Sequence, residues 1–151
     1  MAMVGMSYTN EVWINMDITK GNEWTDHSMP EKKYKAFAGL VTKADKTRHL
    51  IVAGGCCTDD SDDPTSTWIM DIDGNNEWRK GQSSLNQFDG VSLQYEDSVL
   101  AVGGSTDENE ASNKIWWFDS TTETWMEMEH KLSAGRENAA AFLIPNNYAV
   151  C

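Results

Sequence analysis

Short apolar runs recur along the chain and are separated by polar turns that contain Gly, Asn and Asp. The glycine pairs at 54–55 and 103–104 each follow four apolar residues, and 49 positions separate the two pairs. One further step of this length in each direction reaches the apolar runs 1–4 and 148–151. Runs of this kind, bounded by turn residues, predict short β-strands. Their regular spacing predicts a chain built from one recurring structural unit.

The tryptophans keep the same period. In each unit, one Trp lies in a short apolar segment that ends in Asp, and a second Trp follows 9 to 11 residues later. Six of the seven tryptophans fit this pattern: Trp13 with Trp24, Trp68 with Trp78, and Trp116 with Trp125. A repeat of two different features at one spacing is stronger evidence for a structural unit than either feature alone.

A further apolar segment completes each unit, at 36–41, 88–95 and 139–144. Each full unit therefore contains four predicted strands, and no window shows the sustained spacing of an amphipathic helix. Four antiparallel strands in about 49 residues, repeated along the chain, are typical of β-propeller blades. The sequence predicts an all-β fold.

The unit resembles the kelch motif, in which an apolar run and a Gly-Gly pair precede an aromatic-Asp step and a later Trp. The motif stands here as Leu-Ala-Val-Gly-Gly at 100–104, Phe118-Asp119 and Trp125, and it recurs at 51–55. Met16 and Met70 replace the usual Tyr, and Gly5-Met6 replaces the first glycine pair. The resemblance implies a partial kelch-type β-propeller of four-stranded antiparallel blades, with two complete blades and flanking part-blades. The expected division is 1–29 (part blade, last three strands), 30–82 (full blade), 83–130 (full blade) and 131–151 (part blade, first two strands).

The repeated glycines and tryptophans are expected to serve the structure. Paired glycines adopt backbone angles that other residues avoid, and Trp side chains cover large apolar areas between packed sheets. An aromatic row that binds a ligand is the alternative, but recurrence at the blade period favours packing. The residues concerned are Gly54, Gly55, Gly103, Gly104, Trp24, Trp68, Trp78, Trp116 and Trp125.

The number of strands is too small for a closed propeller, which needs about four to eight blades. We expect the chain to be a piece of a longer propeller that packs against the remaining blades. The rival account is a second copy of the chain, so that two chains close a six-bladed ring.

The formal net charge of −12 disfavours binding to nucleic acid or to anionic membranes, because a surface of that sign repels phosphate. The longest mainly apolar stretch, 50–57, is too short to span a bilayer. Three cysteines and no visible secretion signal favour an intracellular, cytoplasmic setting.

Loops after the second and fourth strands of each unit are expected to share one face of the propeller. Variable loops on a rigid scaffold commonly bind partners, and the kelch resemblance implies a peptide or protein partner, with substrate recognition in a larger adaptor as one role. Solvated loops without a partner are the alternative, and Arg136 could equally bond between blades. The candidate residues of this face are Lys32, Lys33, Asp59, Asp60, Asp62, Asp63, Asp107, Glu108, Glu110, Lys131 and Arg136.

No catalytic, cofactor or metal site is expected. The aspartates at 59–63 lack the spacing of an EF-hand loop. Some kelch-like propellers are copper oxidases, but His27, His49 and His130 do not form a convergent ligand set in the sequence. An oxidase or other enzyme fragment, and a non-binding structural fragment, are the alternatives to the interaction module.

Overall fold

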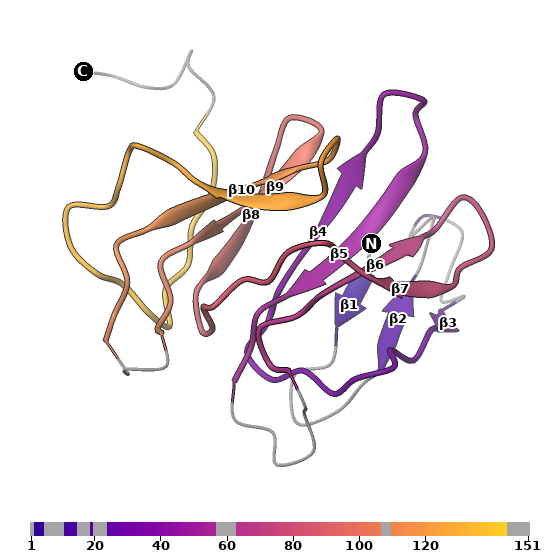
Figure 1. The fold of residues 1–151 in the computed structure, drawn as a ribbon, viewed down its shortest axis with the longest axis horizontal. Helices are drawn as coiled ribbons and strands as arrows, with labels where there is room; N and C mark the ends of the chain where they lie inside the picture. Colours follow the sequence, from indigo (N-terminus) through magenta and orange to yellow (C-terminus); the bar gives the residue numbers. More distant parts are fainter. Residues whose placement is uncertain are drawn as a thin grey trace.

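A computed structural model describes residues 2–4, 11–14, 19, 24–56, 63–106 and 110–144 of the 151-residue chain. The strands in these residues form three antiparallel sheets (Figure 1). We call them the N-terminal sheet, the central sheet and the C-terminal sheet, in chain order. Each sheet is formed by strands that follow one another in the sequence.

The strands of each sheet lie side by side in sequence order. The N-terminal sheet contains β1 (Ala2–Val4), β2 (Val12–Ile14) and β3 (Thr25–Asp26). The central sheet contains β4 (Phe37–Thr42), β5 (Arg48–Ala53), β6 (Thr67–Asp71) and β7 (Trp78–Lys80). The C-terminal sheet contains β8 (Val91–Tyr95), β9 (Ser98–Val102), β10 (Ile115–Asp119) and β11 (Thr124–Glu127).

Strand register confirms that the three sheets are copies of one unit. Val52 is paired with Trp68 in the central sheet, and Ala101 is paired with Trp116 at the same place in the C-terminal sheet. The N-terminal sheet has the same pairing between Met3 and Trp13. The predicted all-β fold is confirmed, with two four-stranded blades and a three-stranded part-blade before them.

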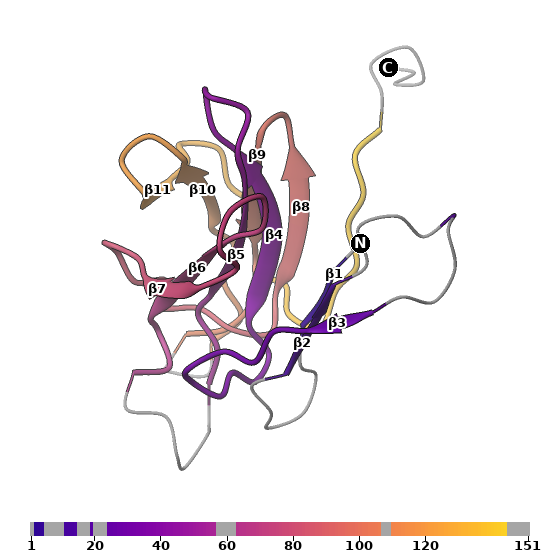
Figure 2. The ribbon, with the colours of Figure 1, turned by 90° about the vertical axis from the view of Figure 1, so that its right-hand side faces the viewer.

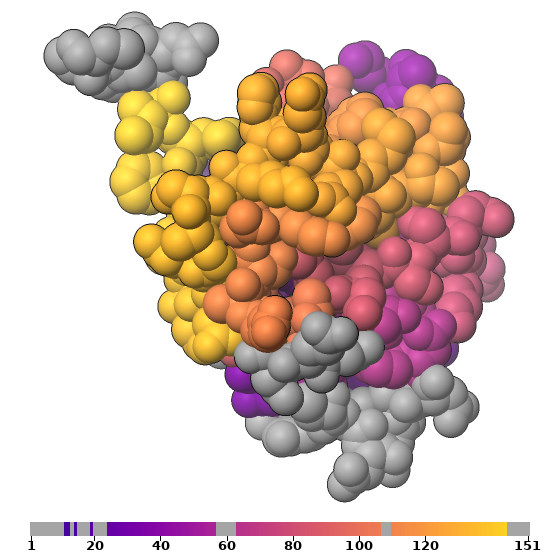
Figure 3. All heavy atoms as spheres, turned by 60° about the vertical axis from the view of Figure 1, so that its left-hand side comes forward, coloured from indigo at the N-terminus to yellow at the C-terminus, as the bar shows by residue number. Residues whose placement is uncertain are grey.

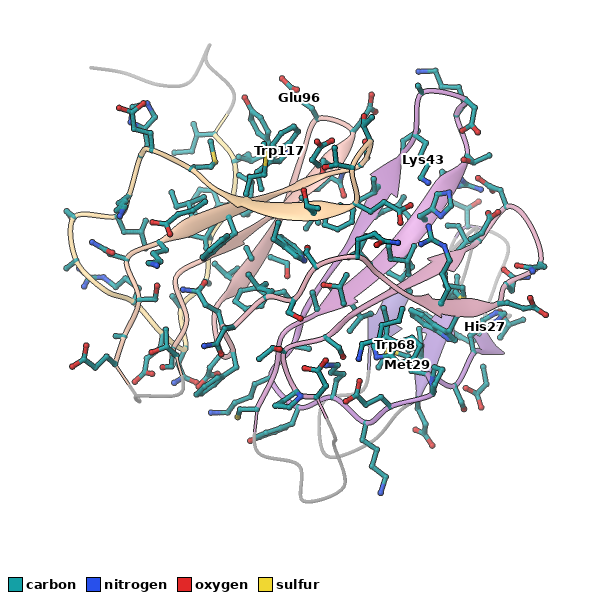
Figure 4. All side chains as sticks on the ribbon, in the orientation of Figure 1. His27, Met29, Lys43, Trp68, Glu96 and Trp117 are labelled. Atoms are coloured by element: carbon teal, nitrogen blue, oxygen red, sulfur yellow. The ribbon has the colours of Figure 1, made fainter. Side chains whose placement is uncertain are left out.

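The core lies between the sheets, because successive residues of a strand point to opposite faces. Leu50 and Val52 of β5 join a buried cluster with Val12 and Ile14 of the N-terminal sheet. The cluster includes Met29, and Trp68 packs against it, so these two side chains lie close together in Figure 4.

The alternate residues of β5, Ile51 and Ala53, join a second cluster with Val99, Ala101 and other side chains of the C-terminal sheet. The central sheet is therefore covered on both faces. Figure 2 shows this stacking from the side.

The segment after the C-terminal sheet differs from the prediction. Residues 131–144 contain no strand, although a strand was expected at 139–144. A strand needs a neighbour that accepts its backbone hydrogen bonds, and the expected neighbour, 148–151, lies outside the described residues. In Figure 2 the last part of this segment, drawn in yellow, extends away from the sheets.

Candidate interaction face

The loops between second and third strands and the linkers between sheets gather at one end of the molecule, the lower end in Figure 1. We call the described residues there the loop face: 27–36, 63–66, 81–90, 103–106 with 110–114, and 128–138. In Figure 3 the orange atoms of the 110–114 segment lie beside the yellow-orange atoms of 131–138. Their contact is close enough that a Cβ on Gly135 would clash with the carbonyl of Ala111.

The glycine pairs bind the loop face together. Gly55 N donates to Gln87 O at 3.0 Å, and Gly104 N donates to Arg136 O at 2.6 Å. In each case, the second glycine of one unit holds the linker that leads into the next. The first glycines, Gly54 and Gly103, have φ angles of 66° and 64°, in the left-handed region that favours glycine.

The linkers are also joined to one another at their ends. Lys35, Asp89 and Asn138 occupy equivalent places before the innermost strand position, and all three have positive φ. Asp89 N donates to Lys35 O, and Asn138 N donates to Asp89 O, each at 2.9 Å. The Lys35 ammonium group also pairs with the Asp89 carboxylate at 2.5 Å, which raises the pKa of Lys35. Asp89 and Asn138 are not among the residues predicted for this face.

Lys33, which was predicted to belong to the binding face, is buried. Its side chain is 1% exposed, and its ammonium group donates to Asp63 O (3.1 Å), Pro64 O (2.8 Å) and Ser66 Oγ (2.7 Å). Burial lowers the pKa of Lys33 to about 8, and the charge of Glu31 opposes this effect. Lys33 therefore joins the linker to the loop after β5, and its burial argues against a contact between its side chain and a partner.

Two further candidates are engaged in ion pairs within the chain. Asp63 accepts hydrogen bonds from Lys80 (2.9 Å) and Thr65 (2.8 Å), and the Lys80 contact lowers the pKa of Asp63. Lys131 pairs with Glu127 at 3.0 Å. These side chains are partly exposed, but a partner would have to compete with contacts already made.

Besides Lys131, the candidates with exposed side chains on the described loop face are Lys32, Glu110 and Arg136. The Arg136 guanidinium donates to the carbonyl of Gly135 at 2.9 Å, so it bonds locally rather than to another blade. The backbone of Arg136 joins its linker to the loop after β9, through the Gly104 contact and through Arg136 N to Ser112 O at 3.0 Å. The other candidates, Asp59, Asp60, Asp62, Asp107 and Glu108, lie outside the described residues.

The tryptophans lie at the seams between sheets and linkers. Trp125 is buried, packs edge-on against Phe118 with ring centroids 5.2 Å apart, and donates from Nε1 to Thr67 Oγ1 of the central sheet at 3.1 Å. Trp78 donates to the carbonyl of His27 at 3.1 Å, and Trp68 donates to Glu31 at 2.7 Å. Trp116 packs against the buried cluster between the central and C-terminal sheets, and Trp24 is half-buried.

Two kinds of feature are absent from the described residues. They contain no group of three or more His, Cys, Asp or Glu side chains arranged to hold a metal ion. They also contain no helix of the length and apolar character needed to cross a membrane.

Comparison with known proteins agrees with the geometry of the C-terminal sheet. Residues 91–130 match the family model of the kelch motif, and this span contains β8 to β11 complete. No curated protein matches the chain in sequence. Because the central sheet repeats the strand order and register of the matched sheet, its kelch-like motif at 51–78 is part of the same repeat. The match at 91–130 supports assignment of the chain to the kelch-repeat family.

Proposed function

We propose that this chain is a protein-interaction module that holds a peptide or protein partner on its loop face, as the recognition part of a larger adaptor. The observation that carries the proposal is the connection of successive loops into one surface. Gly55 and Gly104 fix two linkers to two glycine-pair loops, and the linkers are bonded to one another through Lys35, Asp89 and Asn138.

A surface fixed in this way favours binding, because little loop entropy is lost when a partner docks. Arg136 and Glu110 are exposed on neighbouring loops of this surface and carry opposite charges. Lys32 lies on the linker before the central sheet. These three residues offer a partner charged contacts around a rigid backbone.

A binding role also fits the charge of the chain. Lysine and arginine are outnumbered by acidic residues, 12 against 24, so we propose a protein partner rather than nucleic acid or a membrane surface. We propose no catalytic role, and we expect the module to act in the cytoplasm.

The test is selection of peptides from a displayed random library on the immobilised chain. We expect selected peptides to lose binding to Arg136→Glu and to Glu110→Lys, because these changes reverse exposed charges on the loop face. Lys46→Glu is the matched control, since Lys46 is exposed in the turn between β4 and β5, at the other end of the sheets. Peptides that bind all three variants equally would contradict a role for the loop face, and a library without binders would contradict the module itself.

A further inference from the structure

The C-terminal sheet has one apolar face that no other described element covers. Val99, Ala101, Phe118 and Trp125 belong to the buried cluster shared with the central sheet. The alternate residues point to the opposite face, which we call the outward face. In the register of the sheet, it carries Val91, Leu93, Tyr95, Leu100, Trp117 and Met126. Figure 4 shows Trp117 on the side of β10 away from the central sheet.

Three equivalent positions of the central sheet are buried. Val41 is 1% exposed, whereas its counterpart Tyr95 is 43% exposed. Ile51 and Ile69, the counterparts of Leu100 and Trp117, are each 1% exposed. The difference arises because the C-terminal sheet covers the central sheet, whereas no described sheet covers the outward face.

Other apolar side chains are exposed at this end of the chain. Among the described residues, the exposed large hydrophobic side chains are Tyr95, Met126, Phe142, Leu143 and Ile144. The first two lie on the C-terminal sheet, and the last three belong to the segment after it. Concentration of such side chains at one end marks an interaction surface.

The contact between the central and C-terminal sheets indicates which residues can cover the outward face. The covering face there carries Trp116, which is paired with Ala101. The N-terminal sheet has Trp13 and Met3 at the equivalent register positions. Its other residues Val12 and Ile14 are already buried against the central sheet. The outward face of the C-terminal sheet therefore matches the face of the central sheet that the C-terminal sheet covers. The N-terminal sheet is the part-blade that matches the covering sheet.

The described N-terminal sheet also lacks the strand that would pair with β1. β5 pairs with β4, and β9 pairs with β8, on the side away from the third strand of each sheet. β1 occupies the place of β5 and β9, yet it is the edge of the described N-terminal sheet. Residues 139–144 correspond in the repeat to β4 and β8 and form no strand in the described chain.

We propose that the occupant of the outward face is a second copy of this chain, docked head to tail. The N-terminal sheet of each copy covers the outward face of the other, and residues 139–144 of each copy add a strand to β1 of the other. Each junction repeats the contact already made between the central and C-terminal sheets. Two identical junctions close a ring of six blades, within the range of about four to eight in which propellers close.

The first test is the mass of the 151-residue chain in solution by light scattering over a concentration series. We expect a species of twice 16.9 kDa. The variant Tyr95→Glu/Met126→Glu is expected to have the single-chain mass. Tyr95 becomes buried in the ring, as its counterpart Val41 is, and Met126 takes the place of Arg79, which contacts the covering sheet through Glu123. Ala44→Glu/Gln82→Glu is the control: it adds the same charge at exposed positions off this face and is expected to keep the double mass.

Three results would overturn the proposal. The first is a single-chain mass at every concentration, which would leave the face to another occupant, such as a further blade of a longer polypeptide. The second is a double mass that persists in Tyr95→Glu/Met126→Glu, which would place the contact elsewhere. The third is growth beyond two copies, because head-to-tail contacts that do not close make open chains.

Hydrogen exchange of the unaltered chain provides a readout that does not depend on the folding of a variant. We expect the amides of β1 to exchange more slowly as concentration rises, because the added strand of the partner copy covers this edge. Exchange of β1 that is independent of concentration would also overturn the proposal.

Discussion

At the scale of single residues, Lys33 links two loops by means of a buried positive charge. Its ammonium group has three acceptors within 3.1 Å, two of which are backbone carbonyls of Asp63 and Pro64. A lysine in such a place stabilises a fixed loop geometry, but removal of its charge from water carries a cost. This cost appears as the lowered pKa of Lys33.

The stability of the protein is therefore expected to depend on pH through Lys33. The pKa of this lysine is 10.5 ordinarily and about 8 in the folded chain. Between these values the unfolded state binds more protons, so the free energy of unfolding rises with pH, by at most about 3 kcal/mol. Urea titrations from pH 7 to 10.5 should show this rise relative to Lys33→Met, which lacks the titrating group.

The neighbouring variant Lys32→Met is the control for this measurement. Lys32 is exposed, and its replacement is expected to leave the rise with pH unchanged. Parallel curves for the unaltered chain and Lys33→Met would contradict the buried charge.

The role of a residue can be predicted from the sequence when it depends on residues nearby in the chain. The doublets at 54–55 and 103–104 were visible as glycines, and their positive φ angles explain the requirement for glycine. The burial of Lys33 was not visible, because its acceptors come from a loop about thirty positions later. Asp89 and Asn138 escaped notice because many polar residues stand in turns, and only the backbone shows their shared conformation.

At the scale of elements, one turn joins the two complete blades. Glu123, in the turn between β10 and β11, pairs with Lys43 at 2.8 Å and with Arg79 at 2.5 Å. Lys43 follows β4 and Arg79 lies in β7, so both cations belong to the central sheet, whereas Glu123 belongs to the C-terminal sheet. The carboxylate is mostly buried, whereas Arg79 is about half exposed. The network joins the two blades toward the end opposite the loop face, apart from the apolar contact between their faces.

Replacement of this carboxylate should weaken the junction in a pH-dependent manner. Hydrogen bonding from Arg79, followed by that from Lys43, lowers the pKa of Glu123 from 4.5 to about 2. The stabilisation is thus complete above pH 4.5 and is lost as pH falls toward 2. Because water screens the exposed cations, we expect Glu123→Gln to lower the free energy of unfolding by about 1 kcal/mol at pH 7.

Chemical denaturation at pH 7 and at several acidic pH values would measure this difference. The gap between the unaltered chain and Glu123→Gln should narrow as the pH approaches 2. Glu96→Gln is the matched control, since Glu96 also lies in a turn between strands of the C-terminal sheet and also has positive φ. A constant gap, or an equal loss in Glu96→Gln, would show that the ion pairs are not the cause.

Element prediction succeeded where strands pair with neighbours in the sequence. Every pair in the three sheets joins consecutive strands, so an apolar run and the next turn were enough to locate most of them. The segment 139–144 has the same apolar character but forms no strand, because strand formation also depends on a partner. The apolar pattern alone contains no information about whether that partner is present.

At the scale of the whole molecule, the three sheets form a linear array rather than a single shared core. One buried cluster lies on each side of the central sheet. The C-terminal sheet contributes to only one of the two clusters, and its other face is partly exposed. In repeat proteins the total stability is approximately the sum of the stability of each repeat and the stability of each contact between neighbouring repeats. We therefore expect stability to be greatest in the central sheet.

Amide hydrogen exchange at low protein concentration, where a single copy would dominate, should show this gradient. β5 and β9 are the best pair to compare, because each is the second strand of its sheet and pairs with a strand on both sides. Local hydrogen bonding alone would give them similar protection. Ile51 of β5 is buried, whereas its counterpart Leu100 of β9 is half-buried on the outward face, so opening of the C-terminal sheet exposes less new apolar surface. We expect slower exchange in β5 than in β9. Equal rates would mean that the array unfolds as one cooperative unit, with junctions stronger than the sheets they join.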